Sequence, residues 1–171
     1  MSEHYQKRSF RNRVGLMTAN GWQSLTVPVE RRAGRPRPQE DTLRSQGGEV
    51  KLWRAIRTAY GAAPFFDELA PELEALFLDG PQSLGAWNRA SLEWASVWLG
   101  VSVPSNPIQS MWSIPDHEKD MERWVLEWAE HFNGWAHVWS DRGLEIPFAK
   151  LSCLDVILHC GPEARDWVSP R

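Results

Sequence analysis

Four cationic side chains lie close together near the amino terminus: Lys7, Arg8, Arg11 and Arg13. In an extended chain alternate residues share a face, so Lys7, Arg11 and Arg13 point one way while Arg8 and Asn12 point the other. The planar guanidinium of arginine makes paired hydrogen bonds to phosphate and carboxylate groups. The segment is therefore a candidate anion-binding surface. A solvated edge strand, which commonly carries lysine and arginine, explains the same residues.

A second candidate is the pair Asp155 and His159, which are four residues apart in an apolar stretch near the carboxyl terminus. On one helix this spacing lets a carboxylate and an imidazole orient each other, as a catalytic base and its partner do. Ser152 stands three residues before Asp155 and matches the S-x-x-D form of a capping box. In that interpretation Asp155 only supports the helix start through its charge. Both interpretations stay open on the residues alone.

Standard catalytic signatures do not occur in the chain, which has no GxGxxG, GxxxxGK[ST], HExxH or GxSxG. His131 and His137 lack the flanking spacing of metal ligands, and the two cysteines form no CxxC. Cys153 with a distant histidine would make a nucleophile pair, although a buried structural cysteine explains it better. We therefore expect no metal site and no cofactor.

Composition is that of one globular domain, with 171 residues, 42% hydrophobic and 24% charged. No apolar run has the roughly 18 residues of a membrane span, and the amino terminus lacks the apolar core of a signal peptide. We expect a single domain over residues 1–171, located in the cytoplasm. Residues 1–44 hold nine Lys/Arg against four Asp/Glu, whereas residues 45–171 hold ten against eighteen. This asymmetry suggests a basic face directed at an anion, or a contact between the two halves.

The hydrophobic pattern predicts a mixed α/β fold, in which four to five helices pack on a small sheet containing the basic hairpin. Asn20–Gly21 between two β-favouring runs predicts that hairpin over about 14–29. Apolar residues at helical spacing predict helices over about 49–60, 64–79, 83–99, 116–132 and 153–159. Residues 30–48, rich in arginine, proline and glycine, predict a surface loop whose arginines could close over an anion. Residues 135–139, WAHVW, alternate like a short strand.

Three separated blocks of the chain carry a more specific pattern. They read HYQKRSFRNR and SLTVPV over 4–13 and 24–29, RAIRTAYGAAPFF over 54–66 with Asn88 beyond it, and VWSDR, LSCLDVIL and GPEA over 138–142, 151–158 and 161–164. In this order the blocks resemble the WbqC-like family, bacterial proteins associated with O-antigen and surface-polysaccharide gene clusters.

The resemblance implies roles for individual residues. It assigns ligand binding to Lys7, Arg8, Asn12 and Arg13, and catalysis to Asp155, the aspartate of the family's LSxLD motif. Five further positions are assigned supporting roles: His4, Gln6, Arg57, Asn88 and Ser152.

The chain also departs from the family pattern at polar positions. Leu52 stands where the family has histidine, and His137 where it has glutamine. The asparagine that follows a proline in the family is replaced in this chain, near Lys150. The family's asparagine before Gly-Pro-Glu is replaced by His159–Cys160. The chain begins inside the family's second element, so we expect an N-terminally truncated member.

The resemblance implies a transferase of O-antigen biosynthesis, of glycine or of a sugar. Its partner would be a phosphate-bearing small molecule, such as a nucleotide sugar or an aminoacyl donor, with no role for a membrane. The competing class is a non-catalytic or truncated binding or scaffold protein, which the lost polar positions favour. Nucleic-acid binding through the basic hairpin is a weaker alternative, because the rest of the chain is acidic.

Overall fold

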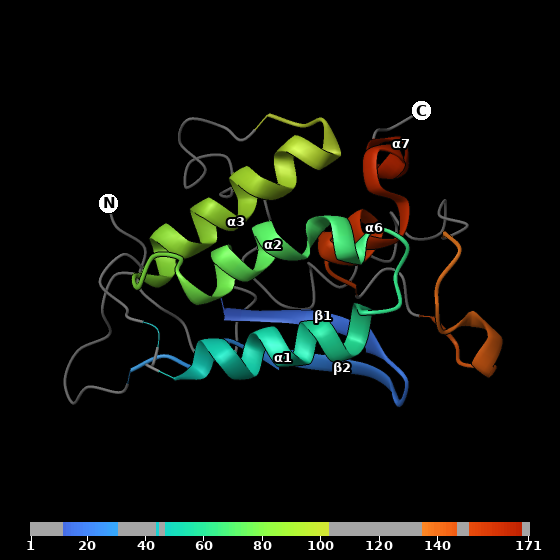
Figure 1. Ribbon diagram of the computed structural model, residues 1–171, viewed down its shortest axis with the longest axis horizontal. Coiled ribbons are helices and arrows are strands. Elements are labelled where there is room, and N and C mark those ends of the chain that lie inside the picture. Colours follow the sequence, from blue (N-terminus) through green and yellow to red (C-terminus); the bar gives the residue numbers. More distant parts are fainter. Residues whose placement is uncertain (1–11, 31–43, 45–46, 103–134, 147–150, 169–171) are drawn as a thin grey trace, which may run out of the picture.

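The structure is a computed structural model, and it describes residues 12–30, 44, 47–102, 135–146 and 151–168. In these ranges a two-stranded antiparallel sheet and the surrounding helices share one hydrophobic core (Figure 1). The mixed α/β class predicted from the sequence is therefore confirmed. The helix expected over 116–132 lies outside the described residues.

The predicted hairpin is formed by strands β1 (Arg13–Thr18) and β2 (Gly21–Thr26), with Arg13 opposite Thr26. The two connecting residues are 19 and 20, so the turn lies one residue earlier than the sequence suggested. Gly21 opens β2 with φ of +98°, a conformation that glycine adopts without a steric penalty. Neighbouring Leu16 and Met17 are both buried, which means that β1 is covered on both of its faces.

Helices α1 (Gly48–Tyr60) and α2 (Phe66–Leu78) follow, close to their predicted bounds. Their buried residues recur every three or four positions, as an amphipathic helix requires. α1 packs against β1 with one side and against α2 with another, and Figure 1 shows it running beside the hairpin. Trp53 of α1 stacks on Phe66 of α2, with ring centroids 6.0 Å apart.

Helix α3 (Leu84–Leu99) begins at Ser83, whose hydroxyl accepts from the Ala86 N–H, and ends at Gly100. The chain returns as α6 (Cys153–Cys160), the short turn η5 (Gly161–Glu163) and α7 (Ala164–Val168). α6 packs against α2 and α3, and α7 against α3. In the described part of the chain, no helix is both long enough and apolar enough to cross a bilayer.

Arg44 is a buried cation that fixes the end of α2. Its guanidinium donates to the carbonyl oxygens of Phe77, Gly80 and Pro81 at 3.1, 2.7 and 2.9 Å. It also lies 5.1 Å from the centroid of the Trp87 ring. The sequence interpretation offered the arginines of residues 30–48 to an anionic ligand. For Arg44 that is wrong, because its donors are used on backbone carbonyls. Residues 31–43 and 45–46 lie outside the described ranges.

The strand predicted over 135–139 is also wrong. Residues 135–137 have no regular structure, and a turn then leads into η3 (Ser140–Arg142). The alternation that suggested a strand is still present, since Trp135 and His137 are buried while residue 136 is exposed. The two buried side chains are directed at α6 instead of at a sheet.

Candidate functional site

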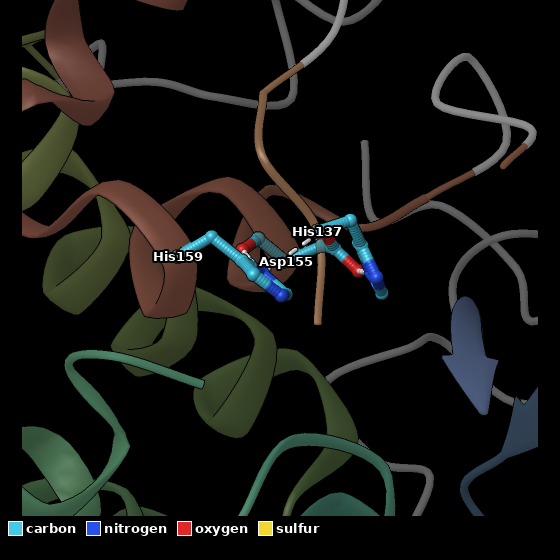
Figure 2. Close-up of side chains that lie close together, drawn as sticks. All are labelled: His137, Asp155 and His159. Atoms are coloured by element: carbon cyan, nitrogen blue, oxygen red, sulfur yellow. Dashed lines mark hydrogen bonds and ion pairs between the residues drawn. The ribbon is translucent and has the colours of Figure 1, made fainter. Parts of the chain in front are cut away.

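Asp155, on the first turn of α6, is fully buried and accepts hydrogen bonds from three parts of the chain. Its Oδ2 accepts from the Tyr60 hydroxyl at 2.7 Å and from His137 Nε2 at 3.1 Å. Its Oδ1 accepts from the Trp135 indole N–H at 2.8 Å and lies 3.4 Å from His159 Nδ1. Figure 2 shows the Asp155 carboxylate beside the imidazoles of His137 and His159. We call these five residues the Asp155 cluster.

The backbone around the cluster fixes which nitrogen of each imidazole carries the proton. His137 Nδ1 lies 3.2 Å from the Trp139 N–H, so this nitrogen accepts and Nε2 holds the proton given to Asp155. His159 Nε2 lies 3.3 Å from the Val138 N–H, so Nδ1 holds the proton and donates to the Asp155 carbonyl oxygen at 2.8 Å. The two rings stack with centroids 4.2 Å apart. Both histidines therefore satisfy their contacts in the neutral form.

These contacts keep Asp155 ionised inside the core. Burial by itself raises the pKa of a carboxyl group, but the hydrogen bonds from His137 and His159, together with the Coulombic attraction of these two side chains, outweigh it and lower the pKa of Asp155 to about 2. Burial, and then the charge of Asp155, raise the pKa of the Tyr60 hydroxyl, which stays protonated as a donor. The cluster thus solvates one buried anion with fixed protein dipoles.

The Asp155 cluster also holds the edge of β1 that does not pair with β2. Tyr60 Oη accepts from the Met17 N–H at 3.4 Å while it donates to Asp155. Ser152, directly before α6, donates its N–H to the Gly15 carbonyl oxygen at 3.0 Å. The position of the hairpin therefore depends on α1 and α6, which meet at the carboxylate.

A metal ion is the first alternative for two histidines and a carboxylate, and one ligand atom of each lies within 4.8 Å of the others. A metal-bound imidazole donates the N–H of its other nitrogen to an acceptor. Here the far nitrogen of each ring faces a backbone N–H, which is a donor. The carboxylate oxygens are also occupied by a phenol and an indole. The contacts fit a hydrogen-bonded carboxylate and do not fit a metal centre.

The described part of the predicted anion site is Asn12 and Arg13, at the start of β1. Asn12 is 5% exposed; its backbone carbonyl accepts from the Val27 N–H at 2.8 Å, and its Nδ2 donates to the Val27 carbonyl at 3.1 Å. Asn12 Oδ1 and Arg13 Nε are buried without a hydrogen-bond partner. Of the buried side-chain atoms in the described residues, only one other, Oε2 of Glu49, shares this condition. Such atoms are uncommon in folded proteins and call for a ligand, a water or another explanation.

The remaining sequence-predicted residues do not gather at one place. Lys7, Arg8, His4 and Gln6 lie outside the described residues. Arg57 is exposed on α1, and Asn88 is half-buried on α3. The structure does not describe Asp155 and the four ligand-binding residues together as one site, and the assignment of these roles stays a prediction.

Ser152 does cap α6, but the predicted capping box does not form. Its hydroxyl accepts from the Leu154 N–H at 3.2 Å. The Asp155 carboxylate turns into the core instead of reaching back to the Ser152 N–H, which is used on Gly15. The i, i+4 pairing of Asp155 with His159 is confirmed at 3.4 Å.

Sequence reasoning missed Tyr60, Trp135 and His137 as partners of Asp155. His137 could have been singled out from the sequence, because it stands where the family pattern has glutamine. Tyr60 lies 95 residues from Asp155 in the sequence, and a tyrosine at the end of an amphipathic helix gives no sign of a distant carboxylate.

In comparison with known proteins, a model of the WbqC-like protein family matches residues 2–146. This chain belongs to that family. The match ends before α6, so it does not include Asp155. The protein Rv1507c of Mycobacterium tuberculosis, which is called uncharacterised, is 34% identical over 100 residues. That alignment covers 57% of this chain and 43% of the relative, so the chain spans less than half of the relative's length. No solved structure gives a significant match.

Proposed function

We propose that this chain binds an anionic activated donor, a nucleotide sugar or an aminoacyl compound, at the start of β1 and acts as a transferase in bacterial surface-polysaccharide (O-antigen) biosynthesis. The observation that carries the proposal is the pair of unpartnered buried atoms on Asn12 and Arg13. Both residues belong to the basic motif that the sequence singled out, and membership of the WbqC-like family supports the biosynthetic setting.

The two atoms suit different parts of such a ligand. The Nε–H of Arg13 is a charged donor and fits an oxygen of a phosphate or carboxylate. Asn12 Oδ1 is an acceptor and fits a hydroxyl or an amide N–H. Arg13 is the first residue of β1, and Asn12 lies directly before the strand. In this proposal Arg13 is the charged ligand contact, while Asn12 joins the segment to Val27 through its Nδ2 and leaves its Oδ1 for a ligand donor.

Group transfer from an activated donor is favoured by positioning the donor and by stabilising the negative charge of its leaving group. Arg13 performs the second task in this proposal, together with Lys7 and Arg8 of the same motif. Asp155 is fully buried and its oxygens already accept from protein donors, so we assign it to positioning the hairpin through Tyr60 and α6.

Isothermal titration calorimetry with nucleotide sugars, free nucleotides and acyl-CoA tests the proposal. One ligand class should bind wild-type protein, and Arg13→Ala should weaken that binding about 10- to 100-fold, because a hydrogen bond to a charged group contributes about 1.5–3 kcal/mol. Arg54→Ala is the matched control: it removes an exposed arginine of α1 and should leave Kd unchanged. Binding that is equally strong in Arg13→Ala, or absent from folded wild-type protein, contradicts the proposal.

A non-catalytic binding protein is the second candidate, and the burial of Asp155 favours it. It shares the ligand site but lacks turnover. Incubation of the protein with the ligand identified by calorimetry, followed by mass spectrometry of acceptor fractions from the same bacterium, separates the two. Transfer that is lost in Arg13→Ala indicates the transferase, whereas tight binding without transfer indicates the binding protein.

A further inference from the structure

The stacked pair His137 and His159 holds a stretch of backbone as well as the carboxylate. The Val138 N–H donates to His159 Nε2 at 3.3 Å, and the next residue's N–H, that of Trp139, donates to His137 Nδ1 at 3.2 Å. Each imidazole is thus used at both nitrogens, donating to Asp155 with one and accepting from the backbone with the other. All of these atoms lie at the junction of residues 135–143 with α6.

A proton added to either ring converts its accepting nitrogen into a donor. The new N–H then points at a backbone N–H, and both groups lose their hydrogen bond in a buried place. An unpaired buried donor is costly, so the backbone must move or admit water. The segment cannot keep its position with a charged imidazole at either site.

The two imidazoles lie beside a negative charge inside the core. Asp155 is a buried anion, and among the described residues no lysine or arginine reaches its carboxylate. Histidine is the side-chain type that changes charge near neutral pH. Within the ranges that the structure describes, the other titratable groups nearby are Tyr60 from α1, Cys160 from α6 and Arg142 from η3, which stacks over Trp139 with its guanidinium 5.1 Å from the ring centroid.

We propose that His137 and His159 form a proton-sensitive latch: a proton on either ring releases residues 138–142 from α6 and α1, while the rest of the core stays folded. Trp139 is the main part of the released contact, since its indole N–H donates to the Ala59 carbonyl oxygen at 3.2 Å. The Ser140 N–H, which donates to the His137 carbonyl oxygen at 2.9 Å, moves with it. Acidification therefore uncovers the end of α1 next to Tyr60.

Amide hydrogen exchange between pH 8 and pH 5, corrected for the intrinsic rate at each pH, tests the latch. Protection of the Val138 and Trp139 amides should fall about tenfold or more on acidification, which is the scale of one lost hydrogen bond. The Phe65 amide, bonded to the Leu158 carbonyl at 3.1 Å, and the Val27 amide, bonded to Asn12 at 2.8 Å, are internal controls. Their protection should stay constant. A parallel loss at all four amides would mean global unfolding and would overturn the latch, as would constant protection at Val138 and Trp139.

The double variant His137→Gln/His159→Gln keeps polar side chains but cannot take up a proton in this range, so the pH dependence at residues 138 and 139 should disappear. Persistence of that dependence in a folded double variant refutes the assignment. If the variant does not fold, side-chain ¹⁵N shifts of wild-type protein at pH 8 decide instead. They should show protons on Nε2 of His137 and Nδ1 of His159, and the opposite tautomers, or displacement of these protons by added Zn²⁺, would overturn the latch.

Discussion

Replacement of Asp155 by asparagine is the sharpest test of the buried cluster. Asparagine has nearly the same shape, but one carboxylate oxygen becomes an NH₂ group. Each oxygen faces two donors: Trp135 and His159 at Oδ1, and Tyr60 and His137 at Oδ2. In the Oδ2 place the new NH₂ group would meet the donors of Tyr60 and His137, and in the Oδ1 place it would meet the Trp135 N–H, since the His159 proton is already given to the Asp155 carbonyl oxygen. In both places the NH₂ group itself also lacks an acceptor. At about 1–3 kcal/mol for each unsatisfied group, Asp155→Asn should lower the free energy of unfolding by roughly 3 kcal/mol at pH 7.

The same variant should change how stability depends on pH. The folded-state pKa of Asp155, about 2, is below its ordinary value of 3.8, so folding favours the ionised form. That stabilisation is complete above about pH 4 and is lost as the pH falls through 4 towards 2. At 1.36 kcal/mol per pKa unit it amounts to roughly 2 kcal/mol. The stability difference between wild type and Asp155→Asn should therefore narrow by about that amount between pH 5 and pH 2.

Urea unfolding followed by circular dichroism at pH 7, 5, 3 and 2 measures both effects. Tyr60→Phe is the graded comparison, because it removes one donor of Asp155 and the acceptor of the Met17 N–H, and it should cost about half as much. An Asp155→Asn protein that is within 0.5 kcal/mol of wild type at pH 7, on the order of an exposed substitution, would refute the cluster as a stabilising unit. So would a stability difference that stays constant down to pH 2.

Two further changes probe the frame around the cluster. Arg44→Lys should lower the free energy of unfolding by about 2 kcal/mol, because an ammonium group cannot span three carbonyl oxygens. Arg54 is exposed on α1, so the control Arg54→Lys should change the free energy of unfolding by less than about 0.5 kcal/mol in the same urea titration. Gly161→Ala should cost about 2–4 kcal/mol, since φ is +52° and the new Cβ would lie 2.5 Å from a ring carbon of Phe65. Gly143→Ala, with φ of +68° but open space, should cost only about 1 kcal/mol by thermal unfolding, and equal losses for the two glycines would contradict the packing argument.

Elements with a strong local pattern were predictable from the sequence. The apolar residues of α1 and α3 recur at helical spacing, and glycines or a capping serine mark their ends, so the bounds came within a residue or two. The hairpin followed from Asn20–Gly21 between two β-favouring runs. The turn was misplaced by one residue, because the pattern does not show whether Gly21 is the last turn residue or the first residue of β2.

The errors have one physical source, which is a tertiary contact that overrides a local signal. Ser152 and Asp155 have the spacing of a capping box, but Tyr60 and Trp135 offer the carboxylate better donors in the core. Trp135 and His137 alternate as in a strand, yet they are directed at α6 and make no strand pairing. Contacts between residues this far apart in the sequence leave no periodic trace in it.

The Asp155 cluster affects the start of β1 only through the position of the strand, so the two sites have different roles. The unpaired edge of β1 is fixed by the Tyr60 hydroxyl and the Ser152 N–H, and both depend on how α1 and α6 meet at Asp155. A change at Asp155 therefore reaches Arg13 through the position of a strand, without any contact between the two side chains. Loss of activity on substitution of Asp155 would consequently be no proof of a catalytic role. A catalytic aspartate would lower turnover while ligand affinity and stability held, whereas a positioning aspartate must lower stability along with affinity.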